Sequence, residues 1–157
     1  MKAVLAVAAA LAIAPVAQAQ ASGCPLLQGI VDGAAAGFPE LRGEELSEDW
    51  FESTLYMTGA DECSVNTGDS NLFYCVWGFD TPEAANSLAT ALSDAGKECL
   101  AGWALEDTGG SKSSNNLTIS KGLNLSGVGG HAGTRVLVFA ESFEGSQESQ
   151  VTIEVRR

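Results

Sequence analysis

The chain has 157 residues with 20 acidic and eight basic side chains, which gives a formal net charge of −12. A surface this negative repels phosphate backbones and anionic lipid head groups, so it excludes nucleic-acid binding and favours a basic protein partner or a divalent cation. The length fits a single domain, and no long linker or internal repeat stands out.

Residues 1–21 have the layout of a secretory signal peptide. Lys2 precedes an apolar run over residues 3–14, and two A-x-A cleavage sites end at Ala19 and Ala21. A membrane-spanning helix needs about 20 apolar residues, so this run is too short to be one. We therefore expect a cleaved signal peptide, a single exported domain over residues 22–157, and a periplasmic or extracellular location. The short, alanine-rich leader favours a bacterial source.

A minor alternative is a lipoprotein anchored through Cys24. Residues 21–23 before this cysteine resemble a lipoprotein cleavage box, but position 21 would then carry a large aliphatic residue, and Gln18 and Gln20 interrupt the apolar run. Soluble export is preferred, with no transmembrane segment.

All four cysteines follow the signal, and an even number in an oxidising compartment predicts two disulfides. Cys63 and Cys75 flank the turn-rich stretch SVNTGDSN and could face each other across a hairpin, which would leave Cys24 with Cys99. The alternative pairs Cys24 with Cys63 and Cys75 with Cys99, and the sequence leaves this choice open. Their spacing matches no zinc site.

The sequence of the first half of the domain predicts one helix and two or three strands. Residues 24–38 have apolar side chains at helical spacing. The acidic stretch 39–50 is expected to be an exposed connection. Residues 51–58 alternate as a strand does, and LFYCVWGF at 72–79 is typical of a buried central strand.

A second helix is predicted over residues 80–99. Asp80 or Thr81 can cap it, Pro82 suits its first position, and Gly96 with Lys97 indicates its end. Its buried stripe is expected to consist of Ala85, Leu88, Leu92 and Ala95.

Strand patterns return over residues 99–106, 117–125, 134–143 and 151–157, and the last two indicate a hairpin. In 117–125, the apolar residues Leu117, Ile119, Leu123 and Leu125 share one parity. The whole pattern predicts an α+β domain: an antiparallel sheet of about five to seven strands with two helices packed on one face.

The stretch GVGGHAG, residues 127–133, has the spacing of a dinucleotide-binding loop. Such a loop must open a helix, whereas a strand pattern follows here, so we interpret it as a glycine-rich connection and expect no nucleotide. His131 within it is the only histidine and is interpreted as a surface residue of that loop.

No catalytic set is apparent, because the chain has no G-x-S-x-G motif and its cysteines are expected to be oxidised. Calcium is the one cofactor considered, on account of Asn66, Asp69 and Asn71 with Asp61 and Glu62 beside them, but turn-forming residues explain the same stretch. We therefore expect no cofactor and favour a protein that is not an enzyme.

The composition and the disulfides favour a small, acidic binding module that acts by protein–protein contact, as an inhibitor, an immunity-type protein or an envelope accessory protein. The candidate partner surface consists of Glu44, Glu45, Glu48, Asp49, Asp69 and His131. The alternative is an exported hydrolase with a carboxylate or Ser–His site that the sequence does not reveal. The oligomeric state stays open.

Overall fold

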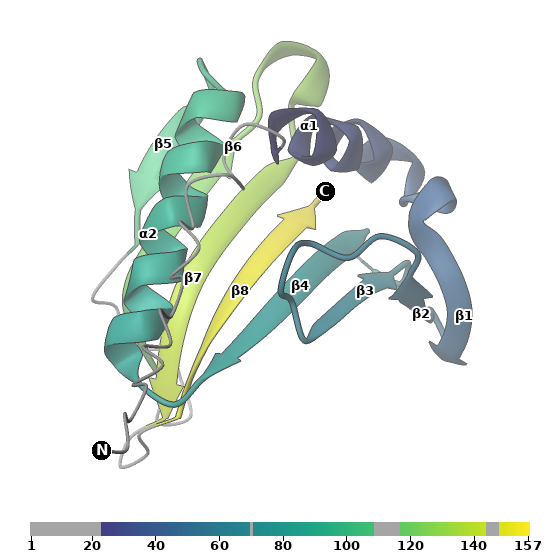
Figure 1. The fold of residues 1–157 in the computed structure, drawn as a ribbon. Coiled ribbons are helices and arrows are strands. Elements are labelled where there is room, and N and C mark those ends of the chain that lie inside the picture. Colours follow the sequence, from purple (N-terminus) through teal and green to yellow (C-terminus); the bar gives the residue numbers. More distant parts are fainter. Residues whose placement is uncertain (1–22, 70, 109–116, 144–147) are drawn as a thin grey trace, which may run out of the picture.

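A computed structural model describes residues 23–69, 71–108, 117–143 and 148–157, and the expected signal peptide lies outside them. Each half of the chain begins with a helix that is followed by four strands (Figure 1). The first half comprises α1 (Gly23–Gly33), β1 (Arg42–Ser47), β2 (Trp50–Ser53), β3 (Glu62–Asn66) and β4 (Leu72–Phe79). The second half comprises α2 (Pro82–Cys99), β5 (Ala104–Asp107), β6 (Leu117–Ser126), β7 (Arg135–Phe143) and β8 (Ser149–Arg156).

The described strands form one antiparallel sheet in the order β1-β2-β3-β4-β8-β7-β6-β5. The α+β class and the predicted β7–β8 hairpin are thereby confirmed, whereas the strand count of five to seven was too low. The expected exposed connection at residues 39–50 contains strand β1, and the predicted strand at 51–58 is only β2, which ends at Ser53.

The sheet order is symmetric about the β4–β8 pair. Each half contributes a helix and a four-stranded antiparallel unit, and the last strands of the two units pair with each other. The sequence shows no repeat, so this duplicated topology is visible only in the structure.

The core lies on one face of the sheet. Helix α2 packs across β4, β6, β7 and β8, and α1 packs against α2, with Leu27, Ile30 and Val31 in the same core (Figure 1). Alternate residues of the long strands point into this core: Phe73, Cys75, Trp77, Leu123, Leu125, Val136, Val138, Ala140, Val151, Ile153 and Val155. The alternate set between them lies on the other face, which neither helix covers.

The buried side of α2 differs from its predicted stripe. Its buried residues are Ala85, Ala89, Ser93 and Gly96, whereas Leu88, Leu92 and Ala95 are only partly buried. Small side chains let the helix axis come close to the sheet: a Cβ at Gly96 would be 3.2 Å from Leu125 Cδ1.

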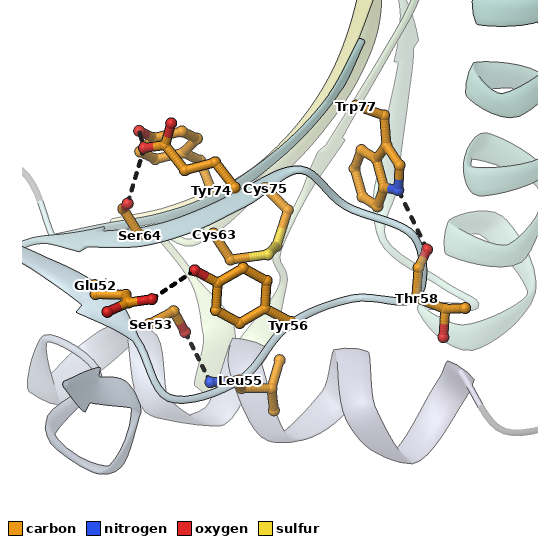
Figure 2. The surroundings of a disulfide bond; sticks show 11 residues. Glu52, Ser53, Leu55, Tyr56, Thr58, Cys63, Ser64, Tyr74, Cys75 and Trp77 are labelled. Carbon is orange, nitrogen blue, oxygen red and sulfur yellow. Dashed lines mark hydrogen bonds between the residues drawn. A yellow bond between two sulfur atoms is a disulfide. The ribbon is translucent and has the colours of Figure 1, made fainter. Parts of the chain in front are cut away.

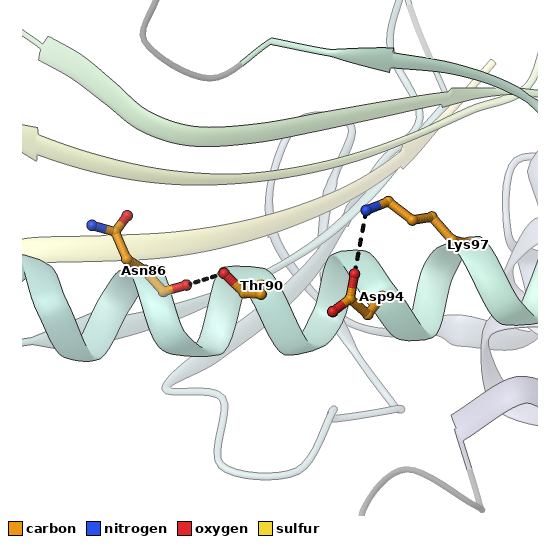
Figure 3. Close-up of polar contacts among 4 residues, drawn as sticks. All are labelled: Asn86, Thr90, Asp94 and Lys97. Carbon is orange, nitrogen blue, oxygen red and sulfur yellow. Dashed lines mark hydrogen bonds and ion pairs between the residues drawn. The ribbon is translucent and has the colours of Figure 1, made fainter.

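The ends and the polar side of α2 agree with elementary helix chemistry. Thr81 caps the helix by accepting a hydrogen bond from the backbone N–H of Ala84. Thr90 Oγ1 donates to the carbonyl of Asn86, and Lys97 Nζ lies 3.2 Å from Asp94 Oδ1 (Figure 3). The helix continues past Gly96 to Cys99.

The structure resolves the disulfide pairing into Cys24–Cys99 and Cys63–Cys75. Cys63 and Cys75 are direct cross-strand neighbours on β3 and β4, as the hairpin interpretation predicted. Cys24–Cys99 joins α1 to the end of α2. A sulfur in this bond cannot also carry a lipid, so the pairing and the lipoprotein alternative are mutually exclusive.

A bulge corrects the expected parity of β6. The register with β7 shifts between Ile119 and Lys121, so Leu123 faces Val138 of the core, whereas Ile119 is opposite Glu141 on the uncovered face. The predicted strand at residues 99–106 is also shorter, because its first residues complete α2 and a turn, and β5 begins at Ala104.

Candidate functional site

Carboxylates are concentrated in one part of the first half, which we call the acidic region, residues 40–69. It contains nine acidic side chains and a single basic one, Arg42. All nine are exposed in the structure: Glu40, Glu44, Glu45, Glu48, Asp49, Glu52, Asp61, Glu62 and Asp69. Like charges at this density create a strongly negative local potential.

The acidic region stays strongly negative, because it has one cation for nine carboxylates and the ion pairs of the described residues do not include Arg42. Arg42 donates from Nε and Nη2 to the carbonyl oxygen of Gly37, at 3.1 and 2.7 Å. The same guanidinium lies 5.6 Å from the centre of the Phe51 ring. Arg42 therefore ties the start of β1 to the preceding turn.

Strand β1 forms one edge of the sheet and carries Glu44 and Glu45. All six of its residues are exposed, and its register with β2 shifts on both sides of Glu45. Leu46 is 59% exposed on this edge. Charges and bulges on an edge strand discourage pairing with another copy of the chain.

Two turns place Glu48 and Asp49 at the same end of the sheet as Asp69. Asp49 has a φ of +63°, which permits the tight β1–β2 turn. Its carbonyl accepts the backbone N–H of Thr67 at 2.9 Å, and its carboxylate lies beside Gly68 in the β3–β4 turn. Five of the six expected surface residues, namely Glu44, Glu45, Glu48, Asp49 and Asp69, thus belong to one region.

The uncovered sheet face carries a polar and aromatic cluster in the same region. Trp50 and Tyr74 are half-buried, with ring centres 5.8 Å apart and ring planes at 81°. Glu62 Oε1 accepts hydrogen bonds from Tyr74 Oη at 2.6 Å and from Ser64 Oγ at 3.1 Å. Burial, followed by the bond to Glu62, raises the pKa of Tyr74, so its hydroxyl stays a donor.

Sequence reasoning noted Glu62 only as a possible calcium ligand and did not single out Trp50 or Tyr74. In LFYCVWGF the residues Phe73, Cys75 and Trp77 alternate with Tyr74 and Val76, and the structure places the two sets on opposite faces. The interpretation as a strand buried on both faces hid this alternation. Strand alternation applied to this run would have placed Tyr74 and Val76 together on the uncovered face.

Tyr56 lies in the segment that joins β2 to β3, which passes beside the Cys63–Cys75 disulfide (Figure 2). Its hydroxyl donates to Glu52 Oε1 at 2.8 Å, and this bond raises the pKa of Tyr56. Ser53 Oγ accepts the backbone N–H of Leu55, which turns the chain out of β2. Trp77 Nε1 donates to the carbonyl of Thr58 and fixes the far part of the segment.

His131, the sixth residue of the expected partner surface, lies outside the acidic region. It ends a 3-10 turn, η4 (Gly129–His131), between β6 and β7, with Nε2 3.8 Å from Asp32 Oδ1 of α1. Its ring lies 5.7 Å from that of Trp103, and it is partly buried rather than fully exposed. Strand β7 follows this turn, so the glycines open no α-helix.

Neither a metal centre nor a membrane helix emerges from the described ranges. No three His, Cys, Asp or Glu side chains within 23–69, 71–108, 117–143 and 148–157 converge closely enough to hold a metal ion. Neither α1 nor α2 is long and apolar enough to cross a membrane.

Comparison of the chain with protein-family models, curated proteins and solved structures finds no match. The geometry of this fold and its charge distribution are therefore the features from which a function can be inferred.

Proposed function

We propose that the protein is an exported binding module that contacts a basic protein through the acidic region. The observation that carries this proposal is the grouping of nine exposed carboxylates with one engaged guanidinium on strands β1–β3 and their turns. Such a surface attracts a cationic partner over a distance of about a Debye length and speeds its association.

The scaffold suits this role because the region is braced. The Cys63–Cys75 disulfide and the bond between Asp49 and Thr67 hold β3, β4 and the two acidic turns together. A surface that is already ordered loses less conformational entropy on binding. The disulfides are compatible with the expected exported location.

A charge-neutralised variant tests the proposal. Glu48→Gln, Asp49→Asn, Glu52→Gln and Asp69→Asn remove four charges from the acidic region while keeping side-chain shape. The matched control, Asp80→Asn, Glu83→Gln, Asp94→Asn and Glu98→Gln, removes four charges from α2 and the residues before it. We expect immobilised wild-type and control protein to retain a basic partner from periplasmic extract at low salt, and the first variant to lose it.

Equal loss in both variants would show that net charge alone matters and would contradict a specific surface. Retention of the basic partner by the first variant would also contradict binding through the acidic region. Circular dichroism of both variants before the capture experiment verifies that each is folded.

The alternative, an exported hydrolase, has one supporting observation, the contact between His131 and Asp32. Both side chains are substantially exposed, and Asp32 Oδ1 also accepts a bond from Gln28. An open depression in the described surface lies elsewhere, lined by Gly78, Phe79, Asp80, Glu148, Ser149 and Gln150. A catalytic histidine needs a place for substrate beside it, so we favour the binding module.

A further inference from the structure

The uncovered sheet face beside the acidic region carries both aromatic rings and carboxylates. Both helices pack on the opposite face, and the register brings Trp50, Ser64, Tyr74 and Glu154 onto this one, across β2, β3, β4 and β8. Two aromatic rings, those of Trp50 and Tyr74, lie on the same face as the carboxylates of Glu62 and Glu154.

Glu62 is held in a fixed position by the protein. Its Oε1 accepts two hydrogen bonds, from Tyr74 and Ser64. Its Oε2 accepts none from the residues that the structure describes, and no basic side chain of those residues lies within ion-pair distance of it. One carboxylate oxygen, already oriented, is therefore left for an external donor.

The neighbouring rings favour a flat cation over a compact one. The Trp50 and Tyr74 planes stand nearly at right angles, at 81°, and both residues are partly exposed. A guanidinium can stack on an aromatic face and donate in its own plane to a carboxylate, whereas an ammonium is a strongly hydrated point charge.

We propose that this face docks an arginine-rich segment of the partner protein, with one guanidinium placed against Trp50 and Tyr74 and hydrogen-bonded to Glu62. This inference rests on the proposed function, because the acidic region supplies the long-range attraction. The aromatic pair, Trp50 and Tyr74, supplies the preference for arginine over lysine.

The test compares two peptides of equal charge, acetylated and amidated hexa-arginine and hexa-lysine, titrated into the disulfide-bonded protein at low salt. Affinities are measured by calorimetry, and contact is followed through the NMR signal of the Trp50 indole N–H. We expect hexa-arginine to bind about two- to fivefold more tightly than hexa-lysine and to shift the Trp50 signal.

Three variants separate the contribution of the aromatic pair and Glu62 from the contribution of general negative charge. Glu62→Gln and Trp50→Leu should each reduce the arginine affinity by about two- to fivefold and bring the two peptides close to equal affinity. Glu48→Gln removes one charge from the same region away from the aromatic pair. It should weaken both peptides equally and preserve their ratio.

The outcomes distinguish the two proposals. Equal affinity of the wild-type protein for both peptides, or the same effect of Glu62→Gln and Glu48→Gln, would overturn arginine docking and leave the proposed function standing. Binding of both peptides that is unchanged when the acidic region is neutralised would overturn the proposed function itself.

Discussion

Gly127 shows how one residue shapes the loop that resembled a nucleotide site. Its N–H donates to the carbonyl of Thr134 at 2.8 Å, and a Cβ at this position would overlap the carbonyl oxygen of His131. Glycine is required here for close approach of two backbone segments, and the positive φ values occur at Gly129 and Gly133. The sequence interpretation identified the connection correctly but not this reason for Gly127.

Gly127→Ala should therefore destabilise the fold by about 1–3 kcal/mol, because the β6–β7 connection must shift to admit a methyl group. Urea unfolding monitored by circular dichroism measures the change. Gly130→Ala is the matched control, since nothing lies within 4 Å of a Cβ there and its φ is not positive. Equal stability of the two variants would refute the close-approach argument.

Glu154 gives a second residue-scale prediction, on pH dependence. Burial raises its pKa, Glu141 adds to this, and Arg156 opposes it. A carboxyl whose pKa is higher in the folded than in the unfolded state favours folding when protonated. Its penalty is absent below the unfolded-state pKa and complete above the folded-state pKa.

Glu154→Gln should consequently gain stability relative to wild type as the pH rises from about 3.5 to 7. Unfolding free energies of both proteins across this range test the sign. Glu106→Gln, on an exposed edge strand, should show no such trend. A difference between Glu154→Gln and wild type that is constant with pH would contradict the assignment.

At the scale of elements, the sequence predicted what depends on local chemistry. Thr81 and Pro82 correctly predicted the start of α2. Alternation or apolar runs correctly predicted β7, β8 and most of β6. Strand β1 was missed as a strand because an exposed edge strand needs no apolar alternation. Strand β3 has only five residues and was indicated only by the possible hairpin between Cys63 and Cys75. The acidic residues of the site were identified, whereas the Trp50–Tyr74 pair depends on strand register, which the sequence does not fix.

The small-residue side of α2 predicts an overpacking effect. Ala89 is fully buried against the sheet, so Ala89→Leu should cost about 1–3 kcal/mol by forcing the helix outward. Ala84 lies on the exposed side of the same helix, and Ala84→Leu should change stability by less than about 0.5 kcal/mol. Thermal unfolding distinguishes them, and similar values for both would refute close helix–sheet packing.

The two disulfides differ in exposure, and this predicts the order of their reduction. Cys63 and Cys75 are fully buried, whereas Cys24 and Cys99 are partly exposed. Thiol–disulfide exchange requires access to a sulfur, so Cys24–Cys99 should be reduced first under native conditions. Mass spectrometry should show a gain of about 2 Da, then a total of about 4 Da after unfolding.

Alkylation and peptide mapping identify the reduced pair, and labelling of Cys63 or Cys75 in the first step would contradict the prediction. Replacement of Cys24 and Cys99 by serine should cost about 4 kcal/mol, because that bond closes a loop of 75 residues. The same replacement of Cys63 and Cys75 should cost about 3 kcal/mol from their 12-residue loop, together with the loss of buried packing.

Among the described residues, the sheet of the whole molecule ends in strands β1 and β5, and both are acidic. Copies that met edge to edge would oppose carboxylates, among them Glu44, Glu45 and Glu106. The exposed Leu46 and Leu105 would otherwise favour association. The negative charge at these edges opposes association between copies, in addition to the proposed attraction of a basic partner.

Neutralising one edge tests this second purpose. Glu44→Gln with Glu45→Gln should produce concentration-dependent self-association at low ionic strength, measured by light scattering after size exclusion. Glu83→Gln with Glu98→Gln on α2 removes the same charge and should elute as wild type does. Identical elution of all three proteins would show that the carboxylates of β1 do not protect this edge.

Strand β8 is the last described element in the chain, yet it lies in the middle of the sheet, between β4 and β7. Until residues 149–156 have been made, two incomplete sheets each expose an apolar edge strand, and nothing joins them through their backbones. Without that segment the chain cannot complete its core, because Val151, Ile153 and Val155 belong to it. Joining of the two halves into one sheet therefore depends on residues 149–156.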